Sequence, residues 1–154
     1  MFKHVLKRSR AGAWMLASMM GAAALPLHVQ AVEAESVVVR MTDFVNDNGR
    51  VQCGLFDRED GWRDESRALK MTTARIEGKR ATCRFEQVDP GQYAVAVFHA
   101  QANESQVNYG LFGKPQQGVG FSNNPSVTWG PPSFDEAAFR IESATVNLDV
   151  QMKY

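Results

Sequence analysis

The sequence predicts an all-β fold, an antiparallel β-sandwich of about seven strands, from three observations. The first is a series of short segments rich in β-branched and aromatic residues. The second is the turns containing Gly, Asn or Pro that separate these segments. The third is that strands do not alternate with long helical segments, which argues against a parallel α/β sheet. The length of 154 residues favours one domain.

The strands follow one another at short intervals. Residues 36–41 and 50–56, with the turn-forming residues 46–49 between them, are expected to form a hairpin. Residues 93–99 are apolar on both faces, as is typical of a central strand covered on both sides. Further strands are expected at residues 69–76, 81–85 and 145–152.

Residues 99–134 lack a regular apolar period and are rich in Gly, Pro and aromatic residues. A stretch this long inside a compact domain is either functional or folded by its own packing. We expect one long ordered loop here. It is followed by a short helical turn at residues 132–139, with Ser133 as its N-cap.

The N-terminus predicts a secretory signal peptide over residues 1–31 and a single β-sandwich domain over residues 32–154. A basic start precedes an uncharged apolar run at residues 11–25, which is shorter than the roughly twenty residues that span a bilayer. We expect cleavage after Ala31, with Ala34 as the alternative, and hence a periplasmic or secreted protein with no membrane span after cleavage.

Charge excludes one class of partner. The 17 basic and 17 acidic residues balance, and removing the signal segment leaves a net charge of −4. Nucleic acid is therefore not an expected partner.

Cys53 and Cys83 fall at inward positions of two expected strands. An exported chain meets an oxidising compartment in which disulfides persist, so we expect a Cys53–Cys83 bridge. The alternative is two separate buried thiols.

Three motifs resemble the DUF2141 family of small secreted bacterial proteins. They are residues 91–99, residues 111–115 with 118–124, and residues 130–139, and the strand at 50–56 fits the family too. The resemblance implies a β-sandwich of immunoglobulin or prealbumin type and no established activity.

The sequence departs from the family pattern after His99. Family members resemble one another in an acidic run there that looks like a calcium loop, whereas the segment from Ala100 to Asn108 keeps Glu104 as its only carboxylate. One charge rarely holds calcium tightly. We therefore expect no calcium, no other metal and no cofactor.

His99 is the weak catalytic candidate, since it is the only histidine after residue 31. It could act as a general base oriented by Asp57, Asp135 or Glu136. The interpretation we favour is structural, with His99 at a strand end and hydrogen-bonded to the long loop. Serines in this region lack a nucleophile-elbow setting.

The long loop supplies the binding candidates. Its aromatic residues could form a platform for a ligand, or a small core beneath the loop. With His99, the candidates are Tyr109, Phe112, Phe121, Asn123, Asn124 and Trp129.

Together these observations predict a noncatalytic binding or accessory module of the cell envelope. Its partner would be a protein, a glycan or a small ligand. The alternative is a hydrolase-like enzyme that uses His99 with an acidic neighbour.

Overall fold

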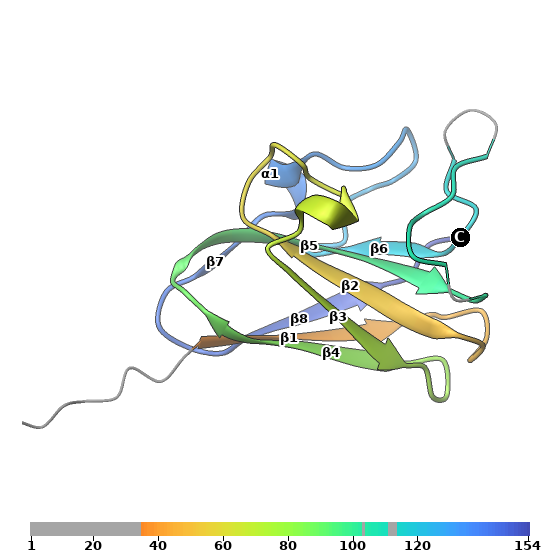
Figure 1. Cartoon of the computed structure of the whole chain (residues 1–154), viewed down its shortest axis with the longest axis horizontal. Coiled ribbons are helices and arrows are strands. Elements are labelled where there is room, and N and C mark those ends of the chain that lie inside the picture. Colours follow the sequence, from red (N-terminus) through yellow and green to blue (C-terminus); the bar gives the residue numbers. More distant parts are fainter. Residues whose placement is uncertain (1–34, 103, 111–113) are drawn as a thin grey trace, which may run out of the picture. The chain divides into compact units, whose positions relative to one another are not determined.

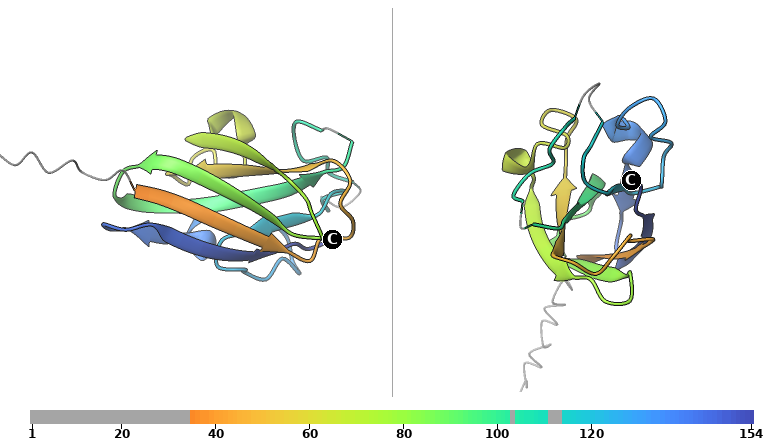
Figure 2. Two further views of the ribbon diagram at one scale, coloured as in Figure 1. Left: turned by 90° about the horizontal axis from the view of Figure 1, so that it is seen from below. Right: turned by 90° about the vertical axis from the view of Figure 1, so that its right-hand side faces the viewer.

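The computed structural model describes residues 35–102, 104–110 and 114–154, which fold into two facing β-sheets (Figure 1). The three-stranded sheet has the order β4(Ala81–Val88)–β1(Glu35–Thr42)–β8(Val146–Gln151). The expected signal peptide at residues 1–31 lies outside the described residues. Figure 2, left, views the three-stranded sheet from its outer side.

The second sheet lies behind the first and carries the remaining strands. Its order is β3(Lys70–Arg75)–β2(Arg50–Phe56)–β5(Gly91–Ala100)–β6(Val119–Phe121), and β7(Phe139–Ile141) also pairs with β5. The described residues therefore form eight strands, against about seven expected. Six of them were located from the sequence, and β6 and β7 are three-residue strands that the pattern does not reveal. The all-β sandwich prediction is confirmed.

The core between the sheets is built from alternate residues of the strands. Val51, Cys53 and Leu55 of β2 are fully buried on one face, as their alternation predicts. They pack with Val37, Val39, Phe85, Val95, Val97 and Val150 from the other strands. Because of this alternation, the other faces of β2 and β5 point away from the core between the sheets.

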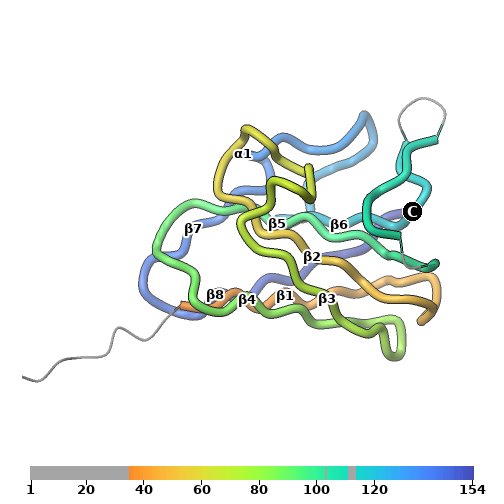
Figure 3. Tube along the Cα trace, in the orientation of Figure 1, coloured from red at the N-terminus to blue at the C-terminus, as the bar shows by residue number. Residues whose placement is uncertain are grey.

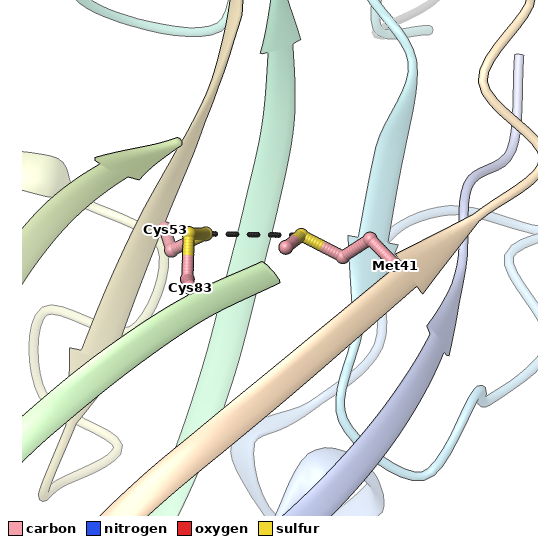
Figure 4. Close-up of a disulfide and its surroundings, with 3 residues drawn as sticks. All are labelled: Met41, Cys53 and Cys83. Atoms are coloured by element: carbon pink, nitrogen blue, oxygen red, sulfur yellow. Dashed lines mark hydrogen bonds between the residues drawn. A yellow bond between two sulfur atoms is a disulfide. The ribbon is translucent and has the colours of Figure 1, made fainter. Parts of the chain in front are cut away.

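A disulfide joins the two sheets through this core. Cys53 of β2 and Cys83 of β4 are bridged, with their Cα atoms 6.7 Å apart, which confirms the predicted pair. The Sδ atom of Met41 on β1 lies 3.8 Å from Cys53 Sγ (Figure 4). Because a bridged sulfur has no proton to donate, this is a packing contact between polarisable sulfurs.

The expected hairpin of residues 36–41 and 50–56 is wrong. β1 and β2 belong to different sheets, so the chain crosses between the layers over residues 43–49. Phe44 is buried in the core at the crossing. Asp47 accepts hydrogen bonds from the backbone N–H groups of Gly78 and Lys79, which holds the crossing against the β3–β4 turn. These contacts fix the crossover.

One strand pairing is parallel. β1 pairs antiparallel with β4 but parallel with β8, with Val39 opposite Leu148. The expected loop at residues 99–134 is not continuous, because β6 lies within it and pairs antiparallel with β5.

The helical turn is confirmed as α1(Phe134–Ala137). The Ser133 hydroxyl accepts a hydrogen bond from the Glu136 N–H, and the Glu136 carboxylate accepts one from the Ser133 N–H. These reciprocal bonds form a capping box. The Ser133 N–H, followed by its hydroxyl, holds the pKa of Glu136 below its usual range.

Removing the disulfide should destabilise the fold without changing its topology. Because the bridge closes a loop over a sequence separation of 30, we expect the double variant C53A/C83A to lose roughly 3–4 kcal/mol of unfolding free energy. Urea denaturation of the variant and the wild type measures the loss. A reductant should lower the wild-type stability and leave the variant unchanged; equal sensitivity of both would contradict this.

Candidate functional site

The outer face of the five-stranded sheet is apolar. Gly54 on β2 lies opposite Ala96 on β5, and Ala96 lies opposite Phe121 on β6. Phe56 precedes the β2–β3 connection, and Phe98 lies towards the other end of β5. Small residues thus occupy the middle of a face that has phenylalanines around it.

Gly54 is needed for the packing of this face. A Cβ atom there would lie 2.8 Å from Cε2 of Phe56 and 3.1 Å from Sδ of Met71. The phenyl ring and the thioether therefore rest over the glycine, beside Ala96. These side chains form an apolar floor.

Three connections rise above this floor, as the chain trace shows (Figure 3). They are the β2–β3 connection with its 3₁₀ turn η1(Glu65–Arg67), the β5–β6 connection and the β6–α1 connection. Trp62 fastens the first to the third, since its Nε1–H donates to the Pro132 carbonyl at 2.9 Å. Its ring also packs edge-on against Phe56 and Phe134, with centroids 5.1 and 5.9 Å away.

A cleft of about 760 Å³ remains between these connections and the sheet. This volume lies in the range of about 300–1,000 Å³ that is typical of small-molecule sites. Ala96 is only partly buried, so its methyl group faces the open space. The floor is formed by Gly54, Phe56, Met71, Ala96, Phe98 and Phe121.

Polar and aromatic side chains line the walls and rim of the cleft. Arg63, Lys114 and Lys153 are cations, and Glu65 is an acid. Burial raises the pKa of Tyr154, so its hydroxyl stays protonated at neutral pH. The arrangement offers an apolar interior, hydrogen-bond donors and positive charge.

His99 belongs to the packing behind the cleft. Its side chain is fully buried, with Nδ1 2.8 Å from the Tyr154 hydroxyl and Nε2 2.7 Å from the Asn48 carbonyl oxygen. Because a carbonyl oxygen can only accept, Nε2 carries the proton and Nδ1 accepts from the hydroxyl. The ring thus joins the β1–β2 crossing to residue 154. The expected hydrogen bond to the long loop is made by the His99 backbone N–H, to the Gly118 carbonyl, and not by the ring.

Two of the three carboxylates considered as partners for His99 are engaged elsewhere. Asp57 pairs with Arg58 at 2.9 Å, and Glu136 closes the capping box of α1. Across the described ranges, no carboxylate lies within hydrogen-bonding distance of the His99 ring nitrogens. The geometry brings His99 together with a hydroxyl and a carbonyl, inside the core.

Of the aromatic residues expected to bind a ligand, one lies in the buried floor of the cleft and two lie at its rim. Phe121 is buried in the floor, with its ring 6.0 Å from that of Trp62. Tyr109 is 50% exposed and Trp129 is 99% exposed, and both line the cleft. Phe112 lies outside the described residues.

Asn123 and Asn124 serve the turn after β6. Both have a positive φ, which asparagine tolerates better than most residues. The Asn123 side chain donates to the Ala138 carbonyl, and Asn124 exchanges hydrogen bonds with the backbone of Asp149 and Gln151. They hold the base of the third connection and lie outside the cleft lining.

The degenerate acidic segment is folded back on itself. The Glu104 carboxylate accepts from the Ala102 N–H at 2.8 Å, and the Gln52 side chain donates to the Glu104 carbonyl. Hydrogen bonds from its own N–H and from that of Ala102 lower the pKa of Glu104. Within the described part of the chain, no group of three or more His, Cys, Asp or Glu residues could hold a metal ion.

Sequence reasoning missed Gly54, Ala96 and Arg63. A signal for the cleft was present in the sequence. The outward face of the expected strand at residues 93–99 carries small alanines as well as a large apolar side chain, which is typical of a surface with a hollow. Using that signal requires the register that sets Gly54 opposite Ala96, which the sequence does not supply.

The described residues form a small two-sheet β-sandwich with an apolar cleft on the outer face of one sheet. The model of the family described as "Uncharacterized protein conserved in bacteria (DUF2141)" matches residues 39–149. The chain belongs to this family, which confirms the resemblance seen in its motifs. Comparisons with curated proteins and with solved structures found no significant match. No helix among the described residues is long and apolar enough to span a membrane.

A structural His99 predicts a stability effect at its partner. The variant Y154F removes the hydroxyl and leaves Nδ1 of a buried ring without a donor, so we expect a loss of about 1–2 kcal/mol of unfolding free energy. Urea denaturation measures this loss. The matched control is Y109F, at a half-exposed tyrosine on the rim, which should change stability by less than about 0.5 kcal/mol. Equal effects of the two variants would contradict the structural role.

Proposed function

We propose that the protein is a noncatalytic binding module of the bacterial cell envelope that takes up a small apolar ligand in the cleft. The observation that carries the proposal is the floor beside Ala96, where the small side chain of Ala96 leaves space that the connections above do not fill. Protein interiors are close-packed, so an apolar hollow of this size under pinned loops favours an occupant.

The surroundings of the cleft support a small ligand over a glycan or a protein. Phe56, Phe98 and Met71 offer apolar surface, whereas glycan sites need dense hydrogen-bonding groups. The exposed rings of Tyr109 and Trp129 stand at the rim, where they could cover part of a bound molecule. A concave site of this volume also fits a small molecule better than it fits the flat surface of a protein partner.

A noncatalytic role is supported by the state of His99. Both ring nitrogens are occupied by structural partners in the core. A general base must reach the proton that it removes, and a buried ring between Asn48 and Tyr154 offers no such access.

Export to the envelope is supported by the N-terminal pattern and by the bridge between Cys53 and Cys83, since disulfides persist in oxidising compartments. Intact mass analysis of the protein expressed from the full coding sequence in a bacterial host tests this. The expected product begins at Val32 and lacks the hydrogens of both thiols. A product in the cytosol that keeps residues 1–31 and free thiols would contradict export.

The cleft itself is tested with a neutral apolar probe, N-phenyl-1-naphthylamine, whose fluorescence rises in apolar surroundings. Binding to the wild type is expected. The variant A96F projects a phenyl ring into the open space beside the floor and should weaken binding by about tenfold or more.

The matched control is T73F, which adds the same ring to the exposed outer face of β3, outside the cleft lining. It should leave probe binding unchanged. Equal binding by A96F and the wild type, at equal thermal stability, would refute the cleft as the site.

A further inference from the structure

The cleft is positively charged on a chain whose formal charge is zero. Its lining contains Arg63, Lys114 and Lys153 against the single acid Glu65. An apolar site lined by an excess of one charge favours ligands that carry the opposite charge.

Three other arginines of the described surface form ion pairs. Arg58 pairs with Asp57, Arg67 with Asp60, and Arg84 with Glu86. By contrast, none of the three cleft cations forms an ion pair with any residue that the structure describes. Lys153 reaches only the Gln151 amide oxygen, at 3.3 Å.

Arg63 has a donor that is both buried and unsatisfied. Its Nε atom is shielded from solvent and has no hydrogen-bond partner in the described part of the chain. A buried donor without a partner costs about 1–3 kcal/mol, and more where the group is charged. Arg63 itself lines the cleft, so an acceptor bound there approaches the guanidinium through its terminal N–H groups.

The backbone holds Arg63 in place. Its φ of 67° is unusual for a residue with a side chain. Such conformations persist where the surroundings impose them, and here the preceding residue, Trp62, is fixed between Phe56, Phe134 and the Pro132 carbonyl. The backbone position from which the Arg63 side chain extends is therefore fixed.

Arg63 and Lys153 stand near opposite ends of the floor. Arg63 follows β2 beyond Phe56, whereas Lys153 pairs with Val119, which lies opposite Phe98. Between these ends β5 advances from the level of Ala94 to that of Phe98, about 13 Å at the rise of an extended strand. The apolar floor is thus elongated, and its unsatisfied donor is at one end.

We infer that the ligand is an amphipathic anion, an acyl chain ending in a carboxylate. The carboxylate accepts hydrogen bonds from Arg63, and the chain lies along the floor past Ala96 towards Phe98. A guanidinium binds a carboxylate through paired N–H groups. Lys114 and Lys153 add a longer-range attraction that salt weakens. This inference rests on the proposed function, since it names the substrate class of the same cleft.

The experiment compares ligands with one chain and different head groups. Dodecanoate, dodecyl phosphate, dodecanol and dodecyltrimethylammonium are titrated into the wild-type protein by calorimetry, below their micellar concentrations. Dodecanoate is expected to bind about tenfold more tightly than dodecanol, and the cationic amphiphile more weakly than either. The preference for dodecanoate should shrink as salt is added.

Arg63 is tested by substitution. R63Q should lower dodecanoate affinity to the level of dodecanol, so that the ratio of the two affinities falls to about one. R63K keeps the charge but loses the paired donors, so it should retain part of the preference. The matched control is R58Q, in the same connection but outside the cleft, which should behave as the wild type.

The outcomes separate the inference from the function on which it rests. Equal affinity for dodecanoate and dodecanol overturns the anionic ligand while the apolar cleft stands. A preference for dodecanoate that survives in R63Q overturns Arg63 as the partner of the carboxylate. Tighter binding of dodecyl phosphate than of dodecanoate overturns the carboxylate head group. Failure of the neutral naphthylamine and of all amphiphiles to bind overturns the proposed function itself.

Discussion

The register between β2 and β5 governs both the core and the cleft. Side chains of a strand alternate between its faces, so the pairing that sends Cys53 and Val97 inward also turns Gly54 and Ala96 outward. A slip by one residue would exchange the two sets and bring the cleft residues into the core. The bridge from Cys53 to Cys83 excludes that slip, because a cysteine turned outward could not reach the other sheet. The cleft floor is therefore positioned by covalent chemistry on the opposite face of the same strand.

Local signals were sufficient for much of the fold. Alternation identified the buried faces of β2 and β4, and Ser133 was correctly identified as the cap of α1. The order of the strands needed contacts between distant residues. A turn such as residues 46–49 suits a hairpin as well as a crossover, and burial of Phe44 together with the backbone contacts of Asp47 decided between them. The parallel pairing of β1 with β8 joins the two ends of the domain, which no short-range pattern records.

The candidate site was only partly visible in the sequence. Aromatic residues in the long loop indicated Tyr109 and Trp129, which stand at the rim. Arg63 was hidden in a segment so rich in charge that it resembled an ordinary solvated surface. What distinguishes it from Arg58 is the lack of an ion pair among the described residues, and that is a property of the fold. His99 shows the converse case, since its residue type permits acid–base chemistry and its burial assigns it to the core.

The persistence of the cleft is itself an argument for an occupant. A larger apolar side chain at position 96 would bury more apolar surface under the loops. The β2–β3 and β6–α1 connections cannot close the space instead, because each is held at its base. Trp62 bonds to Pro132, and the buried Ser122 bonds to both strand β5 and the Ala137 carbonyl. A sandwich with a purely structural role would gain stability by filling the hollow, whereas a binding protein loses its site by doing so.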